Sequence, residues 1–422
     1  MADAMRNASA GAPGSVEAFG VDGLRVLLRA NPAQPVVAAR FYLRGGAANA
    51  DPARAGIEAM LGRTARRGSL RFPKSLLNAA IARLGADIGS AAGFDLMVFH
   101  LRCLRRDLDD AWDLFTDVII QPRLEAEELE LVRQQMLLER RRLLDSPDGA
   151  LGERAQAHCY AGHPYAALPY GTDSSLQALD TAALRAHAAR HVTRANALLV
   201  LAGDVDAGTA RTLAGRFTAL PAGAGAAAAL PRLHFEHGAL VVEERALPTN
   251  YVLGEFTAPA LGDPDHPAAL LAMSVLRDRF FEEVRTKRNL SYAPGASLAD
   301  NRANLGSIYV SAVDPAAALQ VMRHEMRRLA DEPLDSKELA DKVSTFVTRY
   351  HLRNETNQAQ AGFLASYELH GGGWEHAAGF VGRLEAVQPA DVQQFAKRSL
   401  RHIQYIYLGD PRRADPQVYV DP

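Results

Sequence analysis

The stretch LQALDTAALRAHAARHV (Leu176–Val192) aligns without gaps with LEAVQPADVQQFAKRSL (Leu384–Leu400), and this repeat decides the fold. Each copy continues into an apolar strand that ends in Gly-Asp, namely ALLVLAGD (Ala197–Asp204) and QYIYLGD (Gln404–Asp410). Further out, each half has an extended apolar segment that leads into Asp-Pro and a helical run with Ala-Met. The copies are offset by about 206 to 213 residues throughout, which indicates a duplicated domain.

The boundary between the two halves is LPAGAGAAAALP, a low-complexity segment with proline near both ends and few side chains to pack. We therefore predict a flexible N-terminal segment at residues 1–20, a first domain at 21–219, a linker at 220–231 and a second domain at 232–422. Strands grouped with helices, without strict βαβ alternation, predict an α+β fold of two homologous α/β-sandwich domains. Each domain should hold a mixed, mostly antiparallel sheet packed with helices.

Three segments of the first half show their secondary structure plainly. GLRVLLRA (Gly23–Ala30) and VVAARFYLR (Val36–Arg44) are predicted to be neighbouring strands joined by the turn residues Asn31–Gln34. LEAEELELVRQQMLLERRRLLD (Leu124–Asp145) has apolar residues at helical spacing and predicts a long amphipathic helix.

Composition excludes several classes of protein. The 422 residues carry 47 basic and 49 acidic side chains, so the net charge of -2 offers no field that would attract nucleic acid. Two cysteines, Cys103 and Cys159, cannot form a disulfide framework and are expected to be buried small hydrophobes. The sequence contains neither a membrane-spanning run nor a visible signal peptide. A soluble protein is expected, and the sequence leaves its compartment open between the cytoplasm and, for a mature form, the periplasm.

Familiar catalytic motifs are missing. GxGxxG, the Walker loop and GxSxG do not occur. His187 and His191 have the i, i+4 spacing that could place two imidazoles on one helix face. The helix lacks the glutamate of a zincin motif and no third ligand is evident, so a helix-surface or packing role is favoured.

The order of segments from about Val21 to Asp410 resembles the pitrilysin or insulinase-type metallopeptidases (family M16), which include processing-peptidase and cytochrome-complex core proteins. In that family an HxxEH helix supplies two zinc ligands and the general base. The counterpart here is GIEAMLGRTARRGS, in which Ala59, Gly62 and Arg63 take the His, Glu and His positions. No histidine occurs between Phe41 and Phe99. The resemblance therefore implies a degenerate zinc site.

The third zinc ligand of the family is a glutamate on a long helix, and Glu139 stands at that position. Because catalytic zinc needs three protein ligands and an activated water, we expect no metal on this chain and a salt-bridged Glu139. In the second half, RDRFFEEVRTKRNLSYA (Arg277–Ala293) resembles a family block in which an arginine and a tyrosine bind the peptide carbonyl or its oxyanion. Arg285 and Tyr292 match these two residues, although Asn289 replaces a family glycine.

This resemblance implies the non-catalytic, substrate-binding subunit of a heterodimeric zinc peptidase, forming one half of a clamshell. A separate HxxEH-bearing subunit would hold the zinc, and short or unfolded peptides would be the substrates. The alternatives are a structural or assembly protein of the same fold, and a peptide-binding scaffold without a proteolytic role. An independently active homodimer conflicts with the missing ligands.

Overall fold

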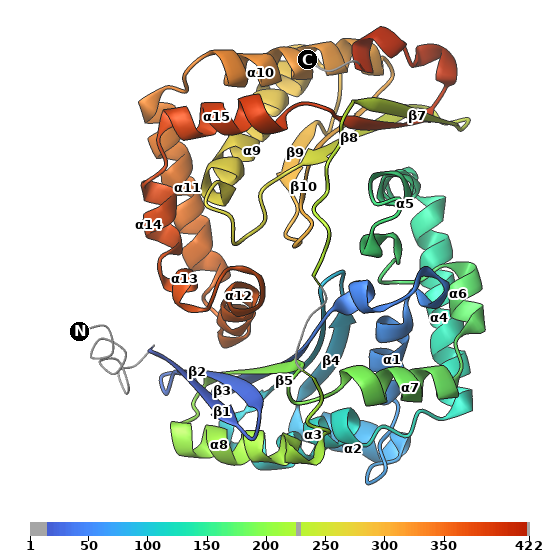
Figure 1. Ribbon diagram of the computed structural model, residues 1–422, viewed down its shortest axis with the longest axis vertical. Helices are drawn as coiled ribbons and strands as arrows, with labels where there is room; N and C mark the ends of the chain where they lie inside the picture. The colour runs from blue at the N-terminus through green and yellow to red at the C-terminus, as the bar shows by residue number, and fades with distance from the viewer. Residues whose placement is uncertain (1–14, 225–228, 420–422) are drawn as a thin grey trace. The chain divides into compact units, whose positions relative to one another are not determined.

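The computed structural model describes residues 15–224 and 229–419, which form two compact units (Figure 1). Unit 1 consists of Met1–Arg140, Ala167–Ala229 and Arg353–Leu369, and unit 2 consists of Arg141–Ala166, Leu230–Leu352 and His370–Pro422. The predicted linker at 220–231 lies partly outside the described residues, as does the predicted flexible segment at 1–20. The latter prediction needs correction at its end, because strand β1 already begins at Val16.

Unit 1 contains a six-stranded sheet in the order β1-β2-β6-β3-β5-β4, in which only β2 and β6 run parallel. Its strands are β1 (Val16–Val21), β2 (Leu24–Ala30), β3 (Val36–Arg44), β4 (Asp87–Ala92), β5 (Leu96–Leu104) and β6 (Ala197–Gly203). On β3, alternate residues from Val37 to Leu43 point into the hydrophobic core. There Phe41 stacks on Phe217 with ring centroids 4.4 Å apart.

Unit 2 contains a five-stranded sheet in the order β7-β11-β8-β10-β9, with β7 and β11 parallel. The strands are β7 (Ala239–Glu244), β8 (Asn250–Thr257), β9 (Gly295–Leu298), β10 (Leu305–Ala312) and β11 (Gln404–Gly409). This order and these directions repeat those of β2-β6-β3-β5-β4 in unit 1. The two α/β domains inferred from the internal repeat are therefore confirmed.

The prediction that β2 and β3 are adjacent is wrong, because β6 lies between them and pairs with both. The connection from β2 crosses the end of β6, where the Asn31 amide donates to the Gly203 carbonyl at 2.7 Å. Gly203 has φ 127°, and a Cβ there would lie 2.4 Å from the Val36 carbonyl oxygen. The glycine of the Gly-Asp motif thus makes room for a crossing strand connection, which local sequence cannot distinguish from a hairpin turn.

Helices cover both sheets. Those in unit 1 are α1 (Ile57–Ala65), α2 (Lys74–Leu84), α3 (Leu108–Ile120), α6 (Asp173–Ala178), α7 (Thr181–His191), α8 (Ala207–Gly215) and α12 (Asn357–His370). Those in unit 2 are α5 (Pro147–Cys159), α9 (His266–Phe280), α10 (Pro315–Asp331), α11 (Ser336–Arg353), α13 (Glu375–Ala378), α14 (Phe380–Glu385) and α15 (Pro389–Ser399). The predicted long helix is α4 (Ala126–Asp145), which begins in unit 1 and ends in unit 2.

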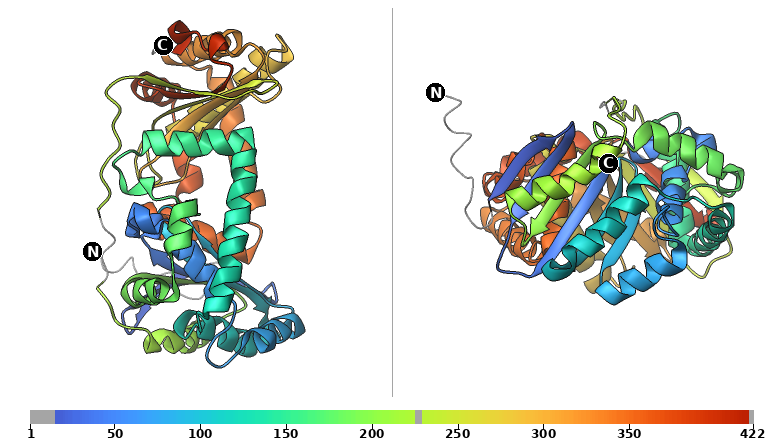
Figure 2. Two further views of the ribbon diagram at one scale, coloured as in Figure 1. Left: turned by 90° about the vertical axis from the view of Figure 1, so that its right-hand side faces the viewer. Right: turned by 90° about the horizontal axis from the view of Figure 1, so that it is seen from below.

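Most helices of each unit cover one face of its sheet. The opposite face is covered by one helix that comes from the other half of the sequence (Figures 1 and 2). Helix α12 lies on the unit 1 sheet, where Glu368 pairs with Arg25 of β2. Helix α5 packs on the unit 2 sheet, where the Tyr309 hydroxyl donates to Asp148 at 2.6 Å. The compact units therefore differ from the halves of the sequence by this reciprocal exchange.

Both cysteines are buried, as expected. Among the described residues, we find no helix with the length and apolar character needed to cross a bilayer.

Candidate functional site

Helix α1 carries the three positions at which the family motif would supply its metal ligands and base. Ala59 and Gly62 offer no donor atom, and the third position is occupied by Arg63. The Arg63 Nη1 lies 2.7 Å from Oε2 of Glu139 on α4, with side chains 35% and 58% exposed. Glu139, the one carboxylate among the positions matched to the family's zinc ligands, is therefore paired with the Arg63 guanidinium. Such an exposed pair stabilises the fold by at most about 1 kcal/mol.

Gly62 is packed so closely that a side chain does not fit. A Cβ at this position would lie 2.8 Å from Oγ and 2.9 Å from Cβ of Ser90 on β4, and 2.9 Å from Cε of Met97 on β5. The methionine end can move, but the Ser90 Cβ is fixed to its strand. A glutamate at position 62 would therefore have to displace the sheet before it could act as a base.

These residues do not fit zinc. Zinc binds thiolate, neutral imidazole or carboxylate, and an arginine that stays protonated cannot donate a lone pair. Within residues 15–224 and 229–419, no group of three or more His, Cys, Asp or Glu side chains is arranged to hold a metal ion.

Sequence reasoning missed a partner of the paired histidines. His187 of α7 is buried, and its Nε2 lies 3.2 Å from Oε1 of Glu58 on α1. The imidazoles of His187 and His191 have centroids 4.4 Å apart, and burial lowers the pKa of His191 to about 4. Between a helix-surface role and a packing role, His187 has the packing role, because its contact with Glu58 joins α1 to α7. The sequence feature that could have indicated this contact is Glu58, a charged residue within the apolar run Ile57–Leu61.

Arg285 and Tyr292 come together in unit 2. Arg285 belongs to a π-helical turn, Phe281–Thr286, that extends α9. Its Cζ lies 4.2 Å from the ring centroid of Tyr292 and 4.7 Å from that of Phe281. Tyr292 is 78% exposed, and the Arg285 guanidinium forms no ion pair with any described residue. The guanidinium is thus positioned by two aromatic rings and can still accept an anionic or carbonyl partner.

The local backbone explains why the arginine and tyrosine meet across seven residues. The Leu290 amide donates to the Val284 carbonyl at 2.9 Å, and the Asn289 amide donates to the Arg285 carbonyl at 3.1 Å. Asn289 has φ 50°, a left-handed conformation that asparagine tolerates better than most residues. The replacement of the family glycine by Asn289 is therefore compatible with this turn, which returns Tyr292 to the arginine. π-Helical turns of this kind occur often at functional sites.

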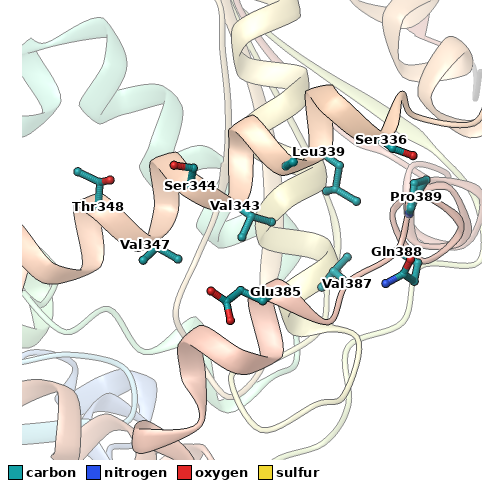
Figure 3. Close-up of a pocket in the computed structure, with 11 residues that line it drawn as sticks. Ser336, Leu339, Val343, Ser344, Val347, Thr348, Glu385, Val387, Gln388 and Pro389 are labelled. Atoms are coloured by element: carbon teal, nitrogen blue, oxygen red, sulfur yellow. The ribbon is translucent and has the colours of Figure 1, made fainter.

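A separate pocket of about 470 Å³ lies between α11 and the segment that joins α14 to α15 (Figure 3). Leu339, Val343 and Val347 form its apolar side, and Glu385 is its only titratable residue. It contains none of the residues singled out from the sequence.

Comparison with known proteins finds the same family in both halves of the chain. Residues 25–173 match the family profile described as Insulinase (Peptidase family M16), and residues 178–346 match the profile described as Peptidase M16 inactive domain. Together these profiles cover most of the chain.

Among curated relatives, an uncharacterized zinc protease of Mycobacterium leprae is 25% identical over 246 residues, which is 55% of this chain and 54% of the relative. An uncharacterized zinc protease of Mycobacterium tuberculosis is 28% identical over 261 residues, 58% of each chain. Cytochrome b-c1 complex subunit 1 of Bos taurus mitochondria is 22% identical over 258 residues, 60% of this chain and 54% of the relative. The chain thus spans about half the length of these curated relatives.

Among solved structures, a peptidase M16 inactive domain from Pseudomonas fluorescens superposes with a TM-score of 0.87 at 21% identity, covering 94% of this chain and 98% of that one. A protease from Helicobacter pylori gives a TM-score of 0.84 at 18% identity, with 94% and 100% covered. These two likenesses establish the fold alone.

Proposed function

This chain belongs to the insulinase-type peptidase family M16, and we propose that it is the non-catalytic, substrate-binding subunit of a heterodimeric M16 zinc peptidase. In this proposal an HxxEH-bearing partner holds the zinc and the general base. The chain described here binds no zinc itself and supplies Arg285 and Tyr292 to the substrate. Its substrates are short or unfolded peptides.

The observation that carries the proposal is the contrast between the two motif sites. At the first, Gly62 has no room for a side chain and Arg63 is paired with Glu139. At the second, Arg285 and Tyr292 are still assembled, 4.2 Å from guanidinium carbon to ring centroid, and Tyr292 is exposed. A chain that has lost its own metal chemistry but retains the carbonyl-binding pair fits a subunit that assists a partner.

The chemistry available to this pair is electrostatic. A guanidinium and a phenol hydroxyl that are positioned in advance can stabilise negative charge as it develops on a peptide carbonyl oxygen. Stacking against Phe281 and Tyr292 restricts the arginine rotamers, so less conformational freedom is lost when substrate binds.

The test is to purify the chain alone and together with an HxxEH-bearing family member from the same genome, and to assay cleavage of an unstructured peptide. The chain alone should be inactive and should contain far less than one zinc per molecule. In the complex, Arg285→Ala should lower kcat about 100- to 1,000-fold, as loss of one oxyanion donor typically does.

Arg288→Ala is the matched control, because Arg288 lies three residues after Arg285, is exposed and is paired with Glu283. Tyr292→Phe keeps the ring over the guanidinium and removes only the hydroxyl, so it separates stacking from hydrogen bonding. Robust zinc-dependent cleavage by the isolated chain would refute the proposal. If kcat were unchanged in Arg285→Ala, the proposed role of Arg285 and Tyr292 in stabilising the oxyanion would be refuted.

A second candidate is an assembly protein of the same fold, favoured by the similarity to cytochrome b-c1 complex subunit 1. It predicts a stable complex with no peptidase activity even when the zinc-binding partner is present. The same cleavage assay therefore separates the two candidates.

A further inference from the structure

The side of α4 opposite its buried residues carries two exposed leucines. Leu131 and Leu138 are 45% and 48% exposed. Because α4 is one continuous helix from Ala126 to Asp145, residues seven positions apart lie on the same side of it, two turns apart. Steps of four and three residues along this side give a continuous stripe, made of Glu127, Leu131, Gln134, Leu138, Arg141 and Asp145. We call these six residues the leucine stripe.

The other sides of α4 are covered by contacts within the chain. On one side Gln135 accepts a hydrogen bond from Arg67 at 2.8 Å, and on the other side Arg140 pairs with Asp173 at 2.8 Å. The residues between these two sides are buried in the core, namely Leu129, Val132 and Met136. By contrast, all six members of the leucine stripe are exposed, and the left view of Figure 2 shows α4 on the near side of the molecule. The leucine stripe is therefore open to a partner.

The exposed charges at the two ends of α4 have opposite signs. Glu127 lies in the first turn, whereas Arg141 and Arg142 lie near the end of the helix. Glu127 and Arg142 form no ion pair with any residue that the structure describes. The helix dipole favours this order of charges within a single chain. It does not account for the two leucines aligned between the charges.

We propose that a second copy of this chain covers the leucine stripe, with its α4 running antiparallel to the first. Leu131 and Leu138 are placed symmetrically about the middle of the helix, and so are Glu127 and Arg142. The register that puts Leu131 opposite Leu138 of the second copy therefore also brings Glu127 level with Arg142 of the second copy. Each contact forms twice, because a two-fold interface uses the same surface of both copies.

The distribution of charge favours a second copy over another partner. A helix that is acidic throughout, or basic throughout, would match only one end of α4. In a parallel pair of copies, Glu127 would lie beside Glu127 and Arg142 beside Arg142, which like charges disfavour. The antiparallel pair brings opposite charges together at both ends, and the net charge of -2 gives two copies little mutual repulsion.

The dimer should be weak and reversible. Each copy contributes one helix, so the area buried should be at the low end for specific interfaces, and we expect a dissociation constant on the order of 10 µM. The dimer is separate from the proposed function, because neither Arg285 nor Tyr292 belongs to the leucine stripe.

The experiment is sedimentation equilibrium of the isolated full chain, at concentrations from well below to well above this dissociation constant. Wild type should convert from monomer to dimer. Leu131→Gln combined with Leu138→Gln should weaken the dimer at least about 10-fold, because apolar contact is lost from both copies. Leu76→Gln combined with Leu352→Gln is the matched control, since these leucines are 52% and 60% exposed on α2 and α11. The control should dimerise like wild type.

Charge exchange tests the antiparallel register. Glu127→Arg alone and Arg142→Glu alone should each weaken the dimer roughly 3- to 30-fold, because an attractive pair that occurs twice becomes repulsive. The two substitutions in one chain should restore wild-type affinity. A mixture of the two single variants should also dimerise more tightly than either variant by itself, because each pair then joins an arginine to a glutamate.

A chain that stays monomeric at every concentration would overturn the inference. A dimer that the leucine variant and its control weaken equally would overturn it too, since the contact would then lie elsewhere. Single charge variants that dimerise like wild type would exclude the antiparallel register. Because the assay uses the isolated chain, its result does not depend on the zinc-binding partner or on cleavage.

Discussion

The closure of the degenerate site can be tested at Gly62 by the smallest possible change, Gly62→Ala. In the middle of a helix this substitution normally stabilises by about 0.5–1 kcal/mol, because alanine loses less backbone freedom on folding. Here the new Cβ would lie 2.8–2.9 Å from the Ser90 side chain. Overpacking of this kind typically costs about 1–3 kcal/mol. The cost of overpacking against Ser90 therefore exceeds the gain from the higher helix propensity of alanine, and we expect a net destabilisation of about 1–2 kcal/mol.

Gly152→Ala on α5 is the matched control, since a Cβ there would have no heavy atom within 4 Å. It should stabilise by about 0.5–1 kcal/mol, so the two variants should differ by about 2 kcal/mol. For a unit of this size, that difference corresponds to roughly 4–8 °C in Tm, which thermal unfolding followed by circular dichroism resolves.

Ser90→Gly should partly rescue Gly62→Ala, because it removes both clashing serine atoms. If Gly62→Ala proves as stable as Gly152→Ala, position 62 can accept a side chain. The steric argument for a permanently closed base position would then fail.

Two further predictions concern stability. Burial lowers the pKa of His266 to about 4, below its unfolded value of about 6.5, so the unfolded chain takes up a proton first as pH falls. The free energy of unfolding, measured by urea titration, should therefore drop by about 1–2 kcal/mol between pH 7 and pH 5. The variant His266→Gln should reduce this drop, whereas the control His324→Gln, at an exposed position, should not. A double-mutant cycle on Arg63 and Glu139 should give a coupling of only about 0.2–1 kcal/mol, and a much larger value would indicate a buried network.

The fold could be predicted from the sequence to the extent that it depends on repetition and periodicity. The duplicated order of segments predicted two sheets with equivalent strands, and the helical spacing of apolar residues located α4 closely. The neighbour of β2 could not be predicted, because a short polar connection fits both a hairpin and a crossing over β6. The pairing of β6 with both β2 and β3 distinguishes these arrangements.

The exchange of α5 and α12 was also beyond prediction. The local sequences of α5 and α12 do not indicate which of the two sheets each helix covers. The decision depends on long-range contacts, such as Arg25 with Glu368, and His158 of α5 with Gln404 of β11 at 3.0 Å. Charge pairs and hydrogen bonds of this kind join residues hundreds of positions apart, so they are defined only when the chain is folded.

By itself, the sequence determined that the positions aligned with the family's HxxEH motif hold Ala59, Gly62 and Arg63, which supply neither a zinc ligand nor a general base. It also determined the duplicated architecture, since hydrophobic periodicity is a local property. Tertiary structure alone decided that Gly62 has no room for a base and that Glu58 meets His187. Those facts depend on distances between atoms that chain order leaves undetermined.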